Sequence, residues 1–326
     1  MQPEERQPRM RTIHISEDER SSTKISAKNL QSALTEFHKN GVVVLQDAIG
    51  IPALDHVKER MLQDVPMNLA SPKVHYNLGK KSQNISQTPP LSPEYLHEEI
   101  WANRFAVAIL EHIIGPQPQL SYATSNIALP RGQGRQAVHS DYYCSHLDFP
   151  VFLQVCIFLD DVSSENGSTE FWLGTHHGYN KKDHVSPTAG WIRREVFTER
   201  ARVSPPLQPA ISKGSICIRD LRLWHAGMPN ATSTPRIMLG FTYSPRWFGS
   251  HMRVRFPVEA RERIESWEHI DCLGVAEFVR GDLDYLESRQ ELHLTQEKPD
   301  PNILYVPRHG TTVIGREHYW SPDDDE

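Results

Sequence analysis

His139 and Asp141 are separated by a single serine, and this spacing can bring two metal-ligating side chains together. Alternate residues of an extended strand face the same side, so the imidazole and the carboxylate would point to one position while Ser140 points away. Completed by a second histidine, such a pair forms a two-histidine, one-carboxylate face, which binds iron(II) and leaves three of its six coordination positions open. The segment is therefore a candidate half of a metal site.

The His-x-Asp spacing by itself does not locate the site, because the chain contains it three times. The other two copies are His146-Leu147-Asp148 and His269-Ile270-Asp271. His146 lies shortly before Pro150 and the next apolar run, which leaves little room for a connecting loop. The copy at 269 is not followed by a comparable pair of a histidine and an arginine. We therefore favour the first copy, at 139, and keep the copy at 146 as the alternative.

A second histidine is expected at the end of a later apolar strand, where the chain reads Leu223-Trp224-His225. A turn over residues 229–235 then leads to Arg236, eleven residues after His225, and a hairpin of this length brings the two near each other on paired strands. A guanidinium binds a carboxylate through two parallel hydrogen bonds and stays charged when buried. Arg236 is therefore a candidate anchor for the carboxylate of an organic acid.

Hydrophobic periodicity predicts which elements must position these residues. Helical spacing predicts helices over residues 27–40, 52–64 and 93–114, with a strand over 42–45 and a long loop over 68–93. From residue 119, short β-branched and aromatic runs predict strands over residues 120–129, 138–143, 151–159, 169–173, 215–219 and 237–243. Strands at this spacing are typical of an antiparallel sandwich or barrel. Two further helices are predicted near residues 258–267 and 273–285.

The same pattern divides the chain into three parts. Residues 1–24 are polar and lack periodicity, and we expect a flexible N-terminal arm there. Residues 25–245 are expected to form one domain, with a helical layer over 25–118 and a β core over 119–245. Residues 246–326 are expected to form an extension that packs on the core or covers the active site.

Bulk composition argues against several classes of partner. A net charge of −6 and a pI near 6.3 argue against a nucleic acid or an anionic membrane held by bulk electrostatics. No stretch approaches the roughly 18 apolar residues of a membrane helix, and the charged N-terminus is unlike a secretory signal. Four widely spaced cysteines without a Cys-x-x-Cys pair suit a reducing compartment, so we expect a cytoplasmic protein.

Several motifs occur together and in a fixed order. They are Asn40-Gly-Val-Val-Val-Leu45, His139-x-Asp141, Phe158-Leu-Asp-Asp161, Glu165-Asn-Gly-Ser-Thr169 with Gly174-Thr-His176, and Leu223-Trp-His225 with Arg236. In order and spacing they resemble the phytanoyl-CoA dioxygenase (PhyH) family of Fe(II)/2-oxoglutarate-dependent oxygenases. The resemblance implies a mainly β chain with flanking α-helices around a double-stranded β-helix, or jelly roll, of the cupin type. It also implies that Arg236 holds the far carboxylate of 2-oxoglutarate.

The resemblance implies further contacts to 2-oxoglutarate. Asn126 lies thirteen residues before His139, and its amide could donate to the co-substrate, although it could equally cap its own backbone. Gln136 is a similar candidate, and the Thr169 hydroxyl is another, with a packing role as the alternative. Relatives often carry a hydroxyl residue two positions after the distal histidine, where this chain has Gly227. The lost hydrogen bond is worth about 0.5–1.5 kcal/mol and would not abolish binding.

The expected activity is that of a 2-oxoglutarate-dependent dioxygenase with Fe(II), 2-oxoglutarate and O2, releasing succinate and CO2. The expected substrate is a small hydrophobic specialised metabolite, altered by hydroxylation, desaturation or a related C–H oxidation. A fatty acyl-CoA or lipid hydroxylase of the same family is one alternative, and a non-catalytic jelly-roll partner subunit or ligand-binding protein is another. The expected partner is the small-molecule substrate, with no nucleic acid, no membrane span and a homodimer as a further possibility.

Overall fold

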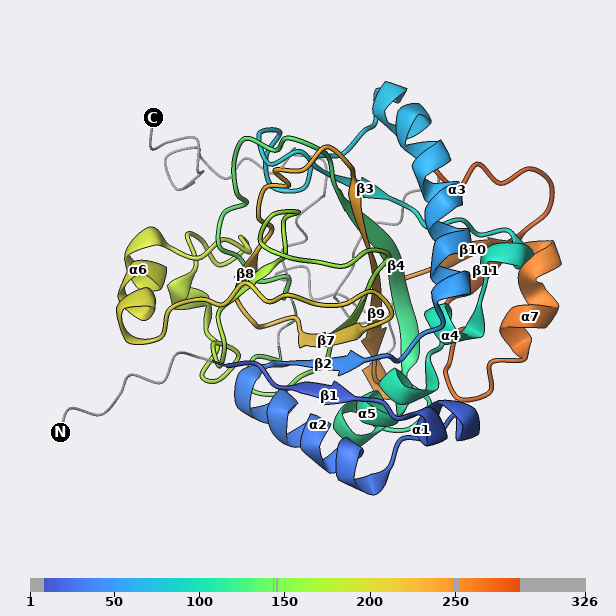
Figure 1. Cartoon of the computed structure of the whole chain (residues 1–326), viewed down its shortest axis with the longest axis horizontal. Coiled ribbons are helices and arrows are strands. Elements are labelled where there is room, and N and C mark those ends of the chain that lie inside the picture. The colour runs from blue at the N-terminus through green and yellow to red at the C-terminus, as the bar shows by residue number, and fades with distance from the viewer. Residues whose placement is uncertain (1–8, 143, 145, 249–251, 288–326) are drawn as a thin grey trace.

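The computed structural model describes residues 9–142, 144, 146–248 and 252–287 (Figure 1). Its main sheet has seven strands in the order β1-β2-β7-β5-β9-β4-β3. Their bounds are β1 Thr12–His14, β2 Val42–Gln46, β3 Asn84–Gln87, β4 Gln119–Ala128, β5 Leu153–Phe158, β7 Ile216–Asp220 and β9 Arg236–Ser244. β1 pairs with β2 in parallel, and the other neighbours are antiparallel. The strands predicted at β2, β4, β5, β7 and β9 are confirmed.

A second, short sheet pairs β6 (Glu170–Phe171) with β8 (His225–Ala226). Side chains of both sheets meet in one buried cluster, in which Val44 and Cys156 of the main sheet pack with Phe171 and Leu223. The two sheets therefore face each other across this cluster. This mainly β architecture with flanking helices is the jelly-roll class that the sequence predicted.

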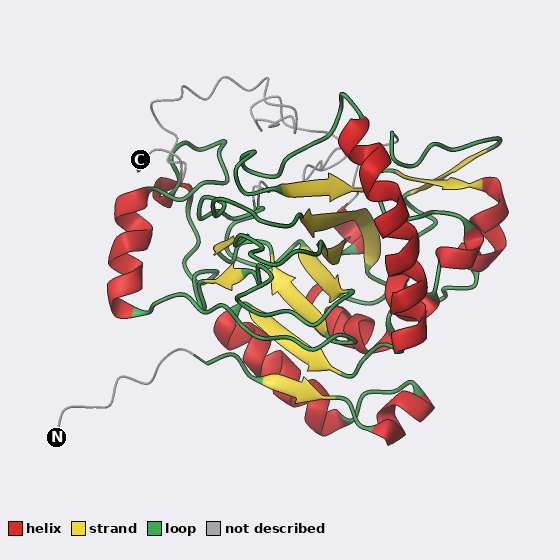
Figure 2. Cartoon of the chain, turned by 45° about the horizontal axis from the view of Figure 1, so that its top comes forward, coloured by secondary structure: helices red, strands yellow, loops and turns green. Residues whose placement is uncertain are grey.

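The other face of the main sheet is covered by helices, as Figures 1 and 2 show. These are α2 (Ala27–Asn40), α3 (Ile51–Ala70) and α5 (Arg104–Ile114). Alternate residues of each strand face the helices or the short sheet. In β2, Val43 and Leu45 point to the helices, whereas Val42 and Val44 point inward, toward the short sheet. Gly41 ends α2 with a φ of +79°, and a Cβ there would lie 2.6 Å from the His176 ring, so two constraints favour glycine.

Two predictions in the N-terminal half were wrong. The expected loop over residues 68–93 contains β3, a polar strand whose backbone pairs with β4. The expected helix over 93–114 is broken into a 3-10 turn at Pro93–Tyr95, α4 (Glu98–Trp101) and α5. The break occurs because the Asn103 side chain caps α5, accepting from the backbone nitrogens of Phe105 and Ala106.

The two ends of the described chain also depart from expectation. Residues 9–24, expected as a loose arm, contain β1 at the sheet edge and α1 (Glu17–Ser22). The helix predicted near 273–285 is instead β11 (Ala276–Val279), which pairs with β10 (Val254–Pro257). Phe256 of β10 packs against Trp101 under the main sheet, so this part of the extension packs on the core. Residues 1–8 and 288–326 lie outside the described residues.

Two short helices complete the described elements. α6 (Arg194–Val203) lies beside the short sheet, and α7 (Arg261–Glu265) follows β10. α7 occupies part of the predicted helix at 258–267, which begins instead with a 3-10 turn at Val258–Ala260. Among the described residues, no helix has the length and apolar character that crossing a membrane requires.

Candidate metal centre and co-substrate pocket

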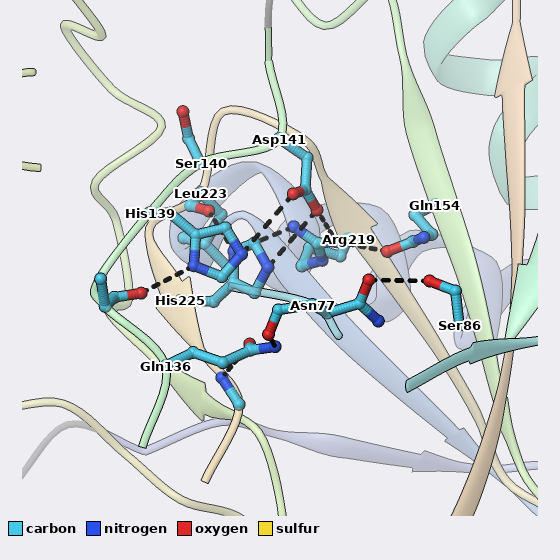
Figure 3. A network of polar contacts seen from close by, with 12 residues as sticks. Asn77, Ser86, Gln136, His139, Ser140, Asp141, Gln154, Arg219, Leu223 and His225 are labelled. Carbon is cyan, nitrogen blue, oxygen red and sulfur yellow. Dashed lines mark hydrogen bonds and ion pairs between the residues drawn. The ribbon is translucent and has the colours of Figure 1, made fainter. Parts of the chain in front are cut away.

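Three ligand atoms from two distant segments converge at one point. The side chains of His139, Asp141 and His225 each offer an atom within 4.8 Å of the others, and within the described residues they are the group that could hold a metal ion. The Nε2 of His139 lies 3.6 Å from Asp141 Oδ1, and the Nε2 of His225 lies 3.4 Å from Asp141 Oδ2 (Figure 3). The sequence prediction thus named three residues that the structure brings together.

Backbone pairing positions the two segments. His139 and His225 form an isolated antiparallel bridge, with N–O distances of 2.9 and 2.8 Å. Two residues on, the Asp141 nitrogen donates to the Leu221 oxygen at 3.1 Å. The strand predicted over residues 138–143 does not form over its described part, 138–142, because consecutive residues bond to different segments: the Ser140 nitrogen donates to the Gly190 oxygen. The segment is still extended enough to point His139 and Asp141 to the same side.

The hydrogen bonds of both imidazoles leave the same nitrogen free for a metal. His139 Nδ1 lies 2.8 Å from the oxygen of Ala137, and His225 Nδ1 lies 3.1 Å from the oxygen of Leu223. A carbonyl only accepts, so the contact of His139 places its proton on Nδ1 and leaves its Nε2 lone pair for a metal. At His225 the Leu223 oxygen favours the same tautomer, and a metal on Nε2 would require it, whereas the Arg219 Nη1 at 3.1 Å opposes it.

Electrostatics keep the three groups in their metal-binding protonation states. Burial and the neighbouring His225 lower the pKa of His139 to about 3, despite the opposing effect of Asp141. Burial and the Arg219 guanidinium lower the pKa of His225. Burial alone would raise the pKa of Asp141, but His225 and Arg219 outweigh it and hold this pKa well below its usual range. At neutral pH the site therefore presents two neutral imidazoles and a carboxylate.

The other two His-x-Asp copies, the alternative at 146 and the discarded one at 269, lie elsewhere. The His146 ring packs between Phe149 and Trp247, with centroid distances of 5.4 and 6.0 Å. His269 Nε2 lies 2.5 Å from the backbone oxygen of Ala102, under the main sheet. Neither histidine joins a cluster of metal-ligating groups among the described residues.

Arg219 contacts two of the three candidate ligands, and sequence reasoning missed it. Its Nη2 donates to Asp141 Oδ2 at 2.7 Å and also to the Gln154 side chain, and its Nη1 lies 3.1 Å from His225 Nδ1. A signal was present in the strand Ile216-Cys-Ile-Arg-Asp220, where Arg219 shares the inward face of Cys217. An arginine on a buried face indicates an acceptor nearby, most favourably a carboxylate.

Arg236 begins β9 and is 2% exposed. Its Nη2 donates to the Gly167 oxygen at 2.5 Å and its Nε to the Asn166 oxygen at 3.4 Å, but its Nη1 is buried without a hydrogen-bond partner. Burial lowers the pKa of Arg236 to about 10, so the guanidinium stays charged at neutral pH. A buried cationic N–H with no acceptor suits an external carboxylate.

Asn126 lies on β4, two register positions from the Arg236–Ala128 pair and therefore on the same face of the sheet. Its Oδ1 is buried without a partner. Rotation of the amide by half a turn would present Nδ2 there instead, as a donor to a carboxylate. Thr169 is half-buried, directly before β6 and two residues after Gly167.

The Gln136 amide is already hydrogen-bonded at both ends. Its Oε1 accepts from the Gly227 nitrogen at 2.7 Å, and its Nε2 donates to the backbone oxygen of Asn77 at 3.0 Å (Figure 3). Asn77 in turn accepts from the Ser86 hydroxyl at 2.7 Å, so the loop before β3 is tied to the site. One Nε2 hydrogen of Gln136 remains for another acceptor.

Two histidines and one carboxylate on a jelly roll, with a buried arginine on the main sheet whose Nη1 lacks a partner, define the class of Fe(II)/2-oxoglutarate-dependent dioxygenases. Residues 37–238 match the family described as Phytanoyl-CoA dioxygenase (PhyH), and the chain belongs to this family. The expected cofactor and co-substrates, Fe(II), 2-oxoglutarate and O2, are those of its class.

Similar solved structures support the fold. A crystal structure of EctD from S. alaskensis with 2-oxoglutarate and 5-hydroxyectoine has a TM-score of 0.53 and 18% identity, covering 68% of this chain and 76% of EctD. The non-heme alpha-ketoglutarate-dependent epimerase SnoN from nogalamycin biosynthesis has a TM-score of 0.51 and 15% identity, covering 68% of this chain and 82% of SnoN. A second SnoN structure is a complex with Fe3+, alpha-ketoglutarate and nogalamycin RO.

Proposed function

We propose that the chain oxidises a C–H bond of a small hydrophobic specialised metabolite, with His139, Asp141 and His225 as the ligands of Fe(II). The observation that carries this proposal is the pairing of a preformed ligand cluster with the unsatisfied Nη1 of Arg236. Fe(II) and 2-oxoglutarate, held by these residues, would supply the oxidising power together with O2, and the keto acid would be released as succinate and CO2.

The roles of the chain's own residues follow from their positions. Arg236 would bind the far carboxylate of 2-oxoglutarate, and Asn126 would donate to the co-substrate beside it. Between the Arg219 and Arg236 ends of the sheet, the inward face carries the small residues Cys156, Cys217 and Gly240. The chain of the keto acid would lie along this part of the inward face. Gln136 and Thr169 would border the same space.

The hydrophobic substrate class is supported by exposed aromatic residues in the segments that follow Asp141 and β9 in the sequence. Phe149 and Trp247 are 46% and 59% exposed, although both rings are large and apolar. Both pack against the ring of His146, and Phe248 packs behind them on Phe152. An exposed apolar rim suits an apolar ligand better than a charged one. Hydroxylation, desaturation or a related oxidation would depend on which C–H bond the pocket presents.

One observation favours the second candidate, a fatty acyl-CoA or lipid hydroxylase. The Gln133 nitrogen donates to the Lys81 oxygen at 3.1 Å, which joins the loop bearing Lys80 and Lys81 to the turn bearing Arg131. These three cations are exposed and could meet the phosphates of a CoA thioester.

The test is a screen for substrate-stimulated 2-oxoglutarate decarboxylation by the iron-loaded protein. One panel would hold apolar metabolites and the other acyl-CoA thioesters, with succinate as the readout and Asp141→Ala as the control. Stimulation by the first panel alone supports the proposal, and stimulation by the second alone replaces it with the acyl-CoA candidate. A protein that binds neither iron nor 2-oxoglutarate would point to the non-catalytic alternative.

The four buried free thiols support a reducing compartment such as the cytoplasm.

A further inference from the structure

A row of polar side chains crosses the inward face of the main sheet next to the candidate ligands. In register, Arg219 of β7 lies beside Gln154 of β5, and Gln154 lies beside Thr242 of β9. Arg219 is 4% exposed, and it reaches from this row to Asp141, as Figure 3 shows. The Gln154 side-chain oxygen accepts from the same Nη2, so the guanidinium is fixed from both sides.

One of the contacts of Arg219 cannot be a hydrogen bond when the site is loaded. A metal on His225 Nε2 requires the proton on Nδ1, and that proton is donated to the Leu223 oxygen. The Arg219 Nη1, 3.1 Å from Nδ1, then faces a second donor. The lasting partners of Arg219 are therefore Asp141 and Gln154.

The carboxylate of Asp141 has two ways to bind a metal. Its Oδ1 is 3.6 Å from His139 Nε2 and its Oδ2 is 3.4 Å from His225 Nε2, so the two oxygens are placed almost equally toward the centre. Bonds from both oxygens and two imidazoles would fill four of six positions. 2-Oxoglutarate would then fill the last two, and none would remain for dioxygen.

We propose that Arg219 is a positioning residue that holds Asp141 Oδ2 away from the metal, so that Asp141 binds through Oδ1 alone. This inference rests on the proposed function. Its basis is the 2.7 Å charged hydrogen bond to one specific oxygen, which that oxygen would have to give up or share in order to bind the metal. The guanidinium also places a positive charge beside a centre that would receive two anionic ligands, the Asp141 carboxylate and 2-oxoglutarate.

The test counts the water molecules on bound Mn2+ by water-proton relaxation, without 2-oxoglutarate. Three positions are open when Asp141 uses one oxygen and two when it uses both. Arg219→Met should therefore lower the relaxation enhancement by about a third relative to wild type, and Arg219→Lys, which keeps a donor for Oδ2, should restore it. Calorimetry should show that Arg219→Met weakens 2-oxoglutarate binding, because the variant lacks a positive charge beside the centre that receives this anion.

Arg222 provides a matched control. It is also 4% exposed, and it pairs with Asp220 at 2.7 Å and with the Leu147 oxygen at 3.0 Å, away from the ligands. Arg222→Met should lower thermal stability but leave the relaxation of bound Mn2+ unchanged.

Wild-type relaxation in folded Arg219→Met would overturn the proposal, even if 2-oxoglutarate binding fell, because Arg219 would then contact the co-substrate directly. If Arg219→Met does not fold, Arg219→Gln takes its place under the same criterion, since an amide is too short to keep the contact. A wild-type protein that fails to bind Mn2+ would instead refute the proposed function.

Discussion

The side-chain oxygen of Gln136 lies 2.7 Å from the backbone nitrogen of Gly227 and occupies the space that a side chain at residue 227 would need. A Cβ built on Gly227 would lie 2.4 Å from this oxygen. The position where the family resemblance led us to expect a hydroxyl is thus filled here by an amide that reaches across from the loop segment before His139. The pair joins the two segments that bear the three candidate ligands.

Gly227→Ser should force the Gln136 side chain out of its position. Overpacking of this kind costs about 1–3 kcal/mol, so the free energy of unfolding in urea should fall by that amount. The double variant Gly227→Ser with Gln136→Ala should recover part of the loss, because the smaller side chain removes the clash. Equal stability of Gly227→Ser and wild type would show that the site relaxes freely and that the two residues are not coupled.

Arg236→Met should weaken the binding of 2-oxoglutarate to the Mn2+-loaded protein. Removing one partner of a buried charged contact costs about 2–5 kcal/mol. The Nη1 of Arg236 has no acceptor in the protein, so it is available to bind the carboxylate of 2-oxoglutarate. Arg236→Lys should be intermediate, because lysine keeps the charge but lacks the planar fork. Arg131→Met, at an exposed arginine, is the control. Anaerobic calorimetry that finds wild-type affinity in Arg236→Met would remove Arg236 from the site.

The protein should lose stability as the pH falls from 6.5 toward 4. Burial lowers the pKa of His176 and of His184 to about 4, so both are neutral when folded and take up protons on unfolding. Their contribution is complete above the unfolded pKa of about 6.5 and is lost as the pH falls below it, at up to about 1.4 kcal/mol per pH unit for each.

His184→Gln isolates one of these contributions. Its buried Nδ1 is hydrogen-bonded to the Ala189 oxygen at 2.8 Å, a bond that an amide can replace. Urea unfolding at pH 7, 6 and 5 should show that the variant loses less stability than wild type over this range. Parallel pH profiles would mean that His184 is not held neutral by the fold.

Much of the fold was predictable because local and tertiary preferences agreed. The helix Ala27–Asn40 was predicted to the residue, since its apolar spacing ends at a glycine whose left-handed φ the fold requires. The strands β3 and β11 were not predicted at all. Their sequences, Asn84-Ile-Ser-Gln87 and Ala276-Glu-Phe-Val279, have little strand character of their own. They are strands because a neighbouring backbone, in β4 and β10, offers partners.

The candidate site was predictable where spacing carries the chemistry. The His139–Asp141 spacing and the later His225 were sufficient to find the ligand cluster. Asn77 was not predictable, since its contribution is a backbone oxygen whose position depends on the loop before β3. Arg219 could have been found, because strand alternation places a charge on the buried face of β7 and only a nearby carboxylate would stabilise it.

The most direct test of the account is a crystal structure with Mn2+ and 2-oxoglutarate, grown without oxygen and measured for anomalous scattering. A single strong anomalous peak is expected about 2 Å from the Nε2 atoms of His139 and His225 and from one oxygen of Asp141. The far carboxylate of 2-oxoglutarate should lie against the Nη1 of Arg236. A metal bound elsewhere, or a co-substrate carboxylate with no contact to Arg236, would contradict the central claim.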